Sequence, residues 1–251
     1  HFLLVPIIAP AMGKYVLDHF NWQAIFYTQI GFCCIIALWF WKRQDETLLV
    51  EKRIKFTKNL FIDGFKELIK YPNTIGYTII SGFVMGSFMV YLSSSQQVFQ
   101  DQYFLKEEFP YIFAGLAISM GLAIFLNGIL VMKLGMKKII DFSMLGYMLV
   151  SLTYVLLFSQ TKNPSIEVLL LFFAAQFFTI GFLFGNLRAM AMQPVGHIAG
   201  IASAITGLIS TLMAVSISVF IGRYISDTVL PLFIGFFVCS SCSIFIIIYL
   251  S

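Results

Sequence analysis

Long apolar runs separated by short polar segments occupy nearly the whole chain. The runs cover approximately residues 1–17, 22–41, 73–97, 109–132, 139–158, 165–187, 198–221 and 229–250. A run of about 20 apolar residues is the length that an α-helix needs to cross the hydrocarbon core of a bilayer. In lipid only helices and closed barrels satisfy their own backbone polar groups, and the alternating ten-residue segments of a barrel are absent. The pattern therefore predicts an all-α membrane protein with eight transmembrane helices.

Composition supports this class. The chain is 59% hydrophobic and 11% charged, whereas a soluble domain has about 25% charged residues. The four cysteines, Cys33, Cys34, Cys239 and Cys242, all lie inside predicted spans. They are interpreted as small apolar packing residues.

One long hydrophilic stretch, residues 43–72, interrupts the pattern. Its apolar residues recur at the spacing of an amphipathic helix on the inner membrane face, which Pro72 is expected to end. An ordinary solvated loop is the alternative. We therefore expect three parts: two helices in 1–42, a cytoplasmic amphipathic linker in 43–72, and a six-helix bundle in 73–251.

The basic residues predict the orientation in the membrane. When the loops are assigned alternately to the two sides, one side holds only Lys14, Lys106, Lys162 and Arg223, and the other holds the remaining 12 of the 16 Lys and Arg residues. Because basic loops stay in the cytoplasm, the richer side is cytoplasmic. In this assignment Arg188 lies in a cytoplasmic loop. The net charge of +4 is thus a topology signal, and no nucleic-acid partner is expected.

Two segments combine glycine or proline with a predicted helix. The first helix reads Val5-Pro6-Ile7-Ile8-Ala9-Pro10-Ala11-Met12-Gly13-Lys14, in which Pro10 bends the helix and Gly13 allows close approach. The fourth helix, 109–132, reads into Gly128-Ile129-Leu130-Val131-Met132-Lys133-Leu134-Gly135-Met136-Lys137-Lys138. These segments resemble the fifth-helix antiporter motif and the second-half cytoplasmic loop of the major facilitator superfamily. Pro10, Gly13, Gly128, Gly135 and Lys137 carry the match, and the resemblance implies a gating role for the motif residues; a plain proline kink and a basic turn are the alternatives.

A third segment is more specific. It runs Gly185-Asn186-Leu187-Arg188-Ala189-Met190-Ala191-Met192-Gln193-Pro194-Val195-Gly196-His197-Ile198-Ala199-Gly200, followed by residues 201–207. This segment resembles the short loop before the eleventh helix of Bcr/CflA-type drug exporters in that superfamily. Asn186, Pro194, Gly196 and Gly200 carry the resemblance.

The resemblance implies a twelve-helix transporter in which this chain supplies the fifth to twelfth helices, as an N-terminally truncated fragment. It also implies a monomer in the bacterial inner membrane that exports hydrophobic or amphipathic drugs in exchange for protons. Small-molecule drugs or metabolites and the lipid bilayer are its expected partners. A metabolite carrier of the same superfamily, working by symport or uptake, is the alternative function.

Polar residues inside the predicted spans are the candidates for the substrate cavity, because polar groups facing lipid are costly. They are Ser87, Tyr91, Ser95, Gln96, Asn127, Gln176 and Thr179. Hydrogen bonds between helices are the alternative role for these side chains. Taken together, the candidates predict an aromatic-rich, uncharged cavity.

The acidic residues all lie in loops or at the ends of spans. A proton-binding carboxylate within the membrane is therefore expected in helices that this chain does not include. The sequence has no ATP-binding G-x-x-x-x-G-K-[ST] run, no cluster of metal ligands, and no arrangement of nucleophile and base. We expect no enzymatic activity, no metal and no cofactor, with a proton gradient as the energy source.

Overall fold

The computed structural model of the chain describes residues 12–13, 15–45, 59–160 and 163–250, and these residues form helices and short connections. Most of the predicted first span, including Pro10, lies outside the described residues, as do positions 46–58 of the linker. The structure therefore tests only the second to the eighth of the eight predicted spans.

Seven long helices correspond to those seven predicted spans. They are α2 (Trp22–Arg43), α4 (Pro72–Gln96), α5 (Phe109–Leu134), α6 (Met136–Phe158), α7 (Ile166–Met192), α8 (Ala199–Gly222) and α9 (Leu230–Leu250). Among the described residues, six apolar segments are long enough to cross a membrane, and the segment Ile166–Gly222 contains both α7 and α8. Predicted and observed helix limits agree within a few residues, except at the end of α7.

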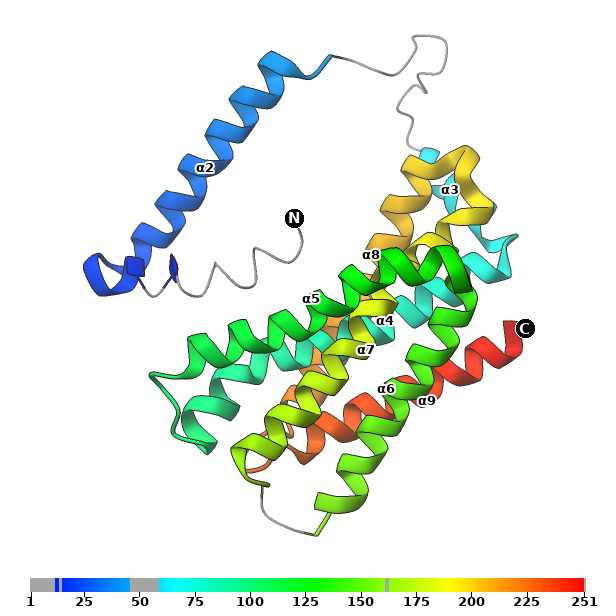
Figure 1. The fold of residues 1–251 in the computed structure, drawn as a ribbon. Helices are drawn as coiled ribbons and strands as arrows, with labels where there is room; N and C mark the ends of the chain where they lie inside the picture. The colour runs from blue at the N-terminus through cyan, green and yellow to red at the C-terminus, as the bar shows by residue number, and fades with distance from the viewer. Residues whose placement is uncertain (1–11, 14, 46–58, 161–162, 251) are drawn as a thin grey trace.

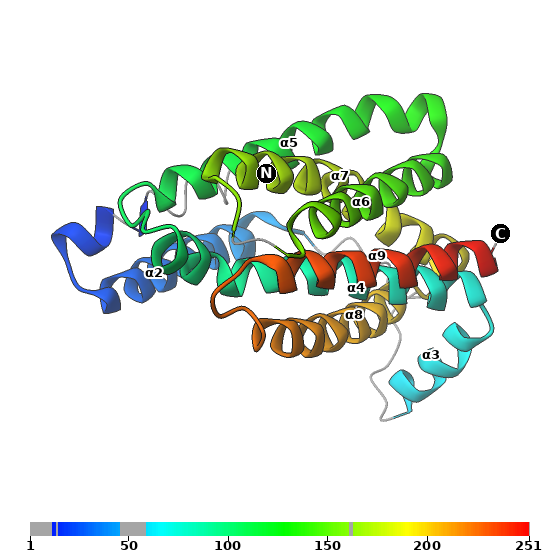
Figure 2. The same ribbon diagram turned by 90° about the horizontal axis from the view of Figure 1, so that it is seen from below.

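Helices α4 to α9 form a bundle of two layers (Figures 1 and 2). One layer holds α5, α7 and α6, and the other holds α8, α4 and α9. Extensive contacts join α4 to α8, α7 and α9, and join α6 to α7 and α9, while α5 packs on α7. Helices α5 and α8 are not among the pairs with extensive contact, so the two layers are separated at that side of the bundle.

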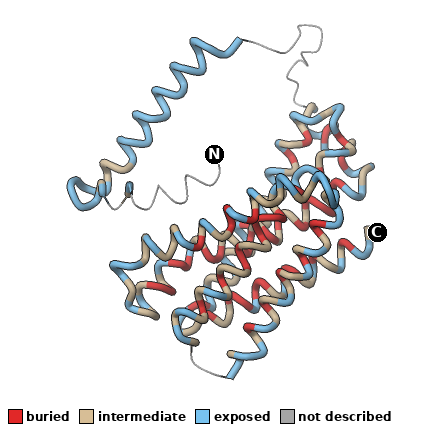
Figure 3. Tube along the Cα trace, in the orientation of Figure 1, coloured by how far each residue is buried: buried red, intermediate tan, exposed pale blue. Residues whose placement is uncertain are grey.

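The core lies at the opposite side, among α4, α6, α7 and α9, where buried residues gather (Figure 3). Its largest fully buried side chains are aromatic. Tyr154 stacks on Phe233 with ring centroids 3.7 Å apart, and Phe173 lies 5.2 Å from Phe233. Aromatic pairs of this kind contribute packing beyond the area that they bury. This aromatic core holds α4, α6, α7 and α9 together behind the separated side.

Helix α2 is different, because none of its residues is buried. Its N-terminus is capped by Asn21, whose side chain accepts a hydrogen bond from the backbone N–H of Ala24 at 3.1 Å. Trp39 and Trp41 on this helix are largely exposed, and most of the helix is coloured as exposed (Figure 3). The apolar surface of α2 is therefore open to lipid or to other helices.

The region predicted to form the linker is described in part and contains the short helix α3 (Leu60–Ile69); its role as a linker stays a prediction. Its buried residues, Gly64 and Leu68, face α8, where Ile201 and Ile205 contact Gly64. The helix ends three residues before Pro72, and Pro72 occupies the first turn of α4, a position where its missing N–H costs nothing.

The loop expected between residues 187 and 198 is also shorter than predicted. Helix α7 continues to Met192 and is followed by a 3-10 helix, η3 (Gln193–Ile198), before α8 begins. The run Arg188-Ala189-Met190-Ala191-Met192 consists of good helix formers, and the helix stops only next to Pro194. Arg188 is consequently a residue of α7, and its assignment to a loop was wrong.

The turn between α5 and α6 consists of Gly135 alone. Gly135 has φ 79°, and its backbone N–H donates to the carbonyl of Val131 at 3.0 Å. Only glycine adopts this left-handed conformation without steric cost. The structure thus gives a local reason for this glycine in the segment 128–138. Gly128 lies inside α5 rather than in the turn.

Candidate functional site

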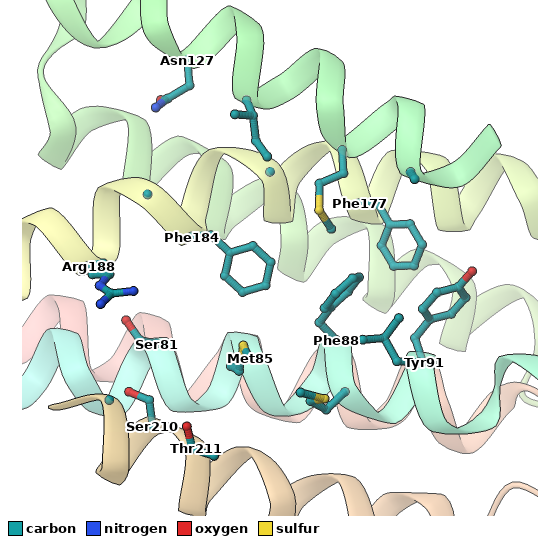
Figure 4. A pocket seen from close by; sticks show the side chains of 18 of the residues that line it. Ser81, Met85, Phe88, Tyr91, Asn127, Phe177, Phe184, Arg188, Ser210 and Thr211 are labelled. Carbon is teal, nitrogen blue, oxygen red and sulfur yellow. The ribbon is translucent and has the colours of Figure 1, made fainter. Parts of the chain in front are cut away.

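A cavity of about 860 Å³ lies between the two layers, where α5 and α8 are apart. Four helices line it, namely α4, α5, α7 and α8 (Figure 4). A volume of this size is within the range of ligand pockets for drug-sized molecules. The cavity is therefore the candidate site for a transported molecule.

The lining residues of α7 show why the sequence builds a wall here. Phe177, Gly181, Phe184 and Arg188 all line the cavity and follow one another at spacings of four, three and four residues. Such spacing places side chains on one face of an α-helix. Helix α4 has the same pattern in Thr78, Ser81, Met85, Phe88 and Leu92. Each helix thus presents one continuous stripe to the cavity.

One end of the cavity is aromatic. The ring of Phe88 lies 5.6 Å from that of Phe177 and 5.7 Å from that of Phe184, both in edge-on geometry. Tyr91 lies 4.5 Å from Phe177 and stacks on Phe113 at 5.9 Å. Uncharged rings with few hydrogen-bonding groups favour apolar and aromatic ligands.

Tyr91 brings a polar atom to this aromatic end. The residue is only 2% exposed, and its hydroxyl has no hydrogen-bond partner among the described residues. A buried hydroxyl without a partner costs about 1–3 kcal/mol. The Tyr91 hydroxyl is thus a hydrogen-bonding group that a ligand or a water molecule could satisfy.

The other end of the cavity is polar. Arg188 lies there, with Ser81 on α4 and with Ser210 and Thr211 on α8 (Figure 4). The Arg188 Nη2 donates to Ser203 Oγ at 3.2 Å. The expectation of an uncharged cavity is therefore wrong. Arg188 had been placed in a loop, and its charge enters the cavity because α7 extends past it.

Close contact between α5 and α7 shapes the cavity at Gly181. A Cβ atom placed on Gly181 would lie 2.6 Å from the backbone oxygen of Met120 and 2.8 Å from Ala123 Cβ. The absence of a side chain here lets the two backbones approach, as small residues do between membrane helices. Helix α5 is thereby held against α7 while it remains apart from α8.

Two of the seven predicted cavity residues, Tyr91 and Asn127, line this cavity. Asn127 lies on α5 at the polar end (Figure 4). Its Oδ1 accepts a hydrogen bond from Nδ2 of Asn186 on α7 at 2.7 Å. Asn186, which carried the family resemblance, is almost fully buried and therefore joins α5 to α7 behind the cavity wall.

Ser87 and Gln176 lie outside the lining and form a buried group with Tyr147 of α6. The Tyr147 hydroxyl donates to Ser87 Oγ at 2.5 Å, and Gln176 Nε2 donates to the Tyr147 carbonyl at 3.3 Å. Both residues therefore form hydrogen bonds between helices, which was the alternative role considered for the polar residues of the spans. Neither residue lines this cavity, because both bond to Tyr147 on the sides of α4 and α7 that meet α6.

The remaining three candidates, Ser95, Gln96 and Thr179, also lie outside the lining of this cavity. Ser95 Oγ donates to the Leu92 carbonyl at 3.2 Å, and Thr179 Oγ1 donates to the Gln176 carbonyl at 2.7 Å. Hydroxyls that bond to their own helix need no cavity. Gln96 is exposed and bonds to Gln100. Contact with substrate stays a prediction for all seven residues.

The other motif residues lie at helix ends and turns. Pro194 and Gly196 belong to η3, and Gly200 is in the first turn of α8. Lys137 is exposed in the first turn of α6, and Gly13 is described only within a short helical segment. A gating role for these residues stays a prediction.

Sequence reasoning missed several lining residues, chiefly Ser81, Met85, Phe88, Phe184 and Arg188. Their spacing of three and four residues along α4 and α7 is visible in the sequence. However, the neighbouring residues are equally apolar, so the spacing did not single out the face that lines the cavity. No group of three or more metal-ligating side chains occurs in the part of the chain that the structure describes.

Comparisons with known proteins agree with this architecture. A family model described as the Major Facilitator Superfamily matches residues 1–218. An uncharacterized MFS-type transporter, YdgK, of Bacillus subtilis is 27% identical over 225 residues, which cover 87% of this chain and 55% of the relative. A bicyclomycin resistance protein homolog of Haemophilus influenzae is 29% identical over 142 residues, covering 55% of this chain and 35% of the relative.

The multidrug resistance protein MdtL of Shewanella oneidensis is 24% identical over 212 residues. These cover 82% of this chain and 51% of that relative. The chain thus matches only about half or less of the length of these curated relatives.

Proposed function

The chain belongs to the Major Facilitator Superfamily, and on this basis we propose that it forms part of a Bcr/CflA-type drug exporter. In this proposal the complete transporter exchanges protons for hydrophobic or amphipathic drugs across the bacterial inner membrane, as a monomer. The chain itself is a multi-pass membrane protein of a non-enzymatic transporter family.

The cavity between α4, α5, α7 and α8 is the observation that carries the proposal. Its lining is dominated by aromatic, methionine and aliphatic side chains, including Phe88, Phe177, Phe184, Met85 and Met120. Methionine adapts its shape to different neighbours, and rings accept many apolar partners. Such a lining suits substrates that are all amphipathic but differ in chemical structure. The printed names of two relatives, which refer to bicyclomycin and multidrug resistance, support the same class.

The mechanism follows from the position of the cavity. In transporters of this architecture, two six-helix halves rock around a central site and expose it alternately to the two sides of the membrane. The open side between α5 and α8 would then face the other half. Within the described spans, acidic residues lie at helix ends, as Asp141 does in α6 and Glu167 in α7. The proton-binding carboxylate is therefore expected in the part of the transporter that this chain does not include.

A metabolite carrier is the second candidate function, and Arg188 favours it. A guanidinium group in the cavity suits anionic metabolites better than an uncharged lining would. Such a carrier would move its substrate inward or by symport.

Drug accumulation in pump-deficient bacterial cells that express the full-length protein would test the proposal. We expect lower accumulation of several fluorescent amphipathic drugs, and we expect a protonophore to abolish the difference. Unchanged accumulation at good membrane expression would contradict drug export. Proton-linked uptake of an anionic metabolite by the same cells would support the carrier instead.

A matched pair of variants would connect export to the cavity. Phe88→Ala removes a ring from the lining, whereas Phe245→Ala removes a ring from the outer surface of α9, where Phe245 is 74% exposed. We expect the first variant to change the relative export of different drugs and the second to leave it unchanged. Equal effects of the two variants would argue against this cavity as the substrate site.

A further inference from the structure

We propose that Arg188 binds the anionic group, a carboxylate in the simplest case, of an amphipathic substrate whose apolar part lies against the aromatic end of the cavity. The inference rests on the proposed transport function and specifies its substrate class. It assigns to Arg188 the role of a specificity-determining residue in the cavity.

The charge of the lining is the first argument. Among the described residues that line the cavity, Arg188 is the one charged side chain, and none is Asp or Glu. Arg188 is exposed on the cavity side of α7, so its guanidinium group is available to pair with an anion. The cavity therefore attracts a negatively charged ligand group to one defined position.

The geometry of α7 is the second argument. Phe184 and Arg188 are separated by one helical turn, which is about 6 Å along the axis, and Phe177 lies about 16 Å from Arg188 by the same measure. All three line the cavity on one stripe. An aromatic or aliphatic body against Phe184 and Phe88 would thus hold its carboxylate next to the guanidinium group.

The neighbours of Arg188 are the third argument. Its Nη2 donates to Ser203 Oγ at 3.2 Å. A guanidinium has five N–H donors, and no other hydrogen bond of this side chain is found within the described residues. Ser81 and Thr211 bring hydroxyl groups to the same end of the cavity (Figure 4), whereas the Ser210 hydroxyl donates to the Thr78 carbonyl at 3.2 Å. The guanidinium group and these two hydroxyls can hold a carboxylate through charge-assisted hydrogen bonds.

Two other roles of Arg188 make different predictions. The bond to Ser203 could serve only to join α7 to α8, in which case the loss of Ser203 would act like the loss of Arg188. Alternatively, a carboxylate elsewhere in the complete transporter could pair with Arg188, which would remove any preference for an anionic ligand.

Ligand binding to the purified full-length transporter would test the proposal. The probes are radiolabelled 4-phenylbutyrate and its primary amide, 4-phenylbutyramide, which differ in charge and have nearly the same shape. We expect the wild type to bind the carboxylate about tenfold more tightly than the amide at neutral pH, as one charge-assisted pair would give. Arg188→Gln should abolish this preference while the affinity for the amide stays unchanged, which also shows that the variant is folded. Ser203→Ala is the matched control and should keep the preference.

Equal affinities for the two probes in the wild type would overturn the proposal, as would the binding of neither. Loss of the preference in Ser203→Ala to the same extent as in Arg188→Gln would overturn it as well. Export is measured separately in cells. An Arg188-dependent preference without export contradicts the proposed drug export alone, and export without the preference contradicts this inference alone.

Discussion

The Tyr147 hydroxyl of α6 donates a 2.5 Å hydrogen bond to Ser87 Oγ of α4, behind the cavity wall and in a fully buried position. The Ser87 hydroxyl also bonds to carbonyls of its own helix, those of Phe83 at 2.9 Å and Val84 at 3.0 Å. The pair therefore links α6 to α4 while Ser87 stays satisfied within α4.

Tyr147→Phe removes this link without leaving Ser87 unpaired. We expect a loss of about 1 kcal/mol in the free energy of unfolding, the usual net contribution of such a bond. The midpoint of thermal unfolding of the full-length protein in detergent would measure it. Tyr154→Phe is the control, because the Tyr154 hydroxyl has no hydrogen bond among the described residues. A similar shift in both variants would show that the link between α6 and α4 does not stabilise the bundle.

Gly181→Ala should be clearly destabilising. The added Cβ would meet the Met120 backbone oxygen at 2.6 Å and Ala123 Cβ at 2.8 Å, so α5 must move away from α7. Overpacking of this kind costs about 1–3 kcal/mol. Gly185→Ala, one turn further along α7, adds a methyl group with no atom within 4 Å and should be neutral. The midpoints of thermal unfolding of the two variants measure this difference in stability. Equal midpoints would contradict the close packing of α5 on α7.

Much of the fold could be predicted because the length of an apolar run decides whether it spans a membrane. The end of α7 could not, because Arg188 was treated as a sign of a loop. A charge at that position is compatible with a helix when the helix borders a cavity. The good helix formers up to Met192 were the better guide.

The cavity was harder to predict than the helices. Lipid is as apolar as a protein interior, so a residue such as Phe88 in the cavity and one such as Phe245 on the outer surface give the same hydropathy signal. Polar residues were also an ambiguous guide. Thr179 bonds to its own helix, and Ser87 bonds to another helix as well as to its own, so their polarity did not require a cavity.

Glu67 predicts a pH dependence in how α3 is held. A hydrogen bond from Lys70 at 2.7 Å lowers the pKa of the Glu67 carboxyl, and the positive charges of Lys70 and of protonated His197 act in the same direction. A carboxyl whose pKa is lower in the folded state stabilises that state above its ordinary pKa, and the stabilisation is lost as the pH falls through the lowered value. The pair is exposed, so the effect should be small.

Spin labels on Ile62→Cys of α3 and Leu208→Cys of α8 would report this dependence, because both side chains are more than half exposed. We expect the distribution of distances between the labels to broaden slightly as the pH falls from about 7 to about 4. With Glu67→Gln added, the distribution should already be slightly broader at neutral pH and should change little on acidification. A distribution in the parent protein that stays narrow at the lower pH would contradict a stabilising role for Glu67.

The contact of α3 with α8 is itself testable by a disulfide. A Cβ placed on Gly64 lies 3.6 Å from Ile201 Cβ, within the range of about 3.5–4.5 Å for bonded cysteines. In a background without Cys33, Cys34, Cys239 and Cys242, we expect Gly64→Cys with Ile201→Cys to form a disulfide on mild oxidation in native membranes. A protease site placed in the linker would reveal it as two fragments that separate only after reduction.

Gly64→Cys with Ile209→Cys is the matched control for that disulfide. Ile209 lies on α8 and belongs to the same apolar cluster as Ile201, but it is eight residues further along the helix, about 12 Å away. This pair should stay reduced under the same conditions. Equal oxidation of both pairs would indicate that α3 slides over α8, and no oxidation of either would mean that α3 is held elsewhere. Only selective oxidation of the first pair fits a short helix α3 that fixes the first turns of α8, the helix that carries Ser203 and Ser210.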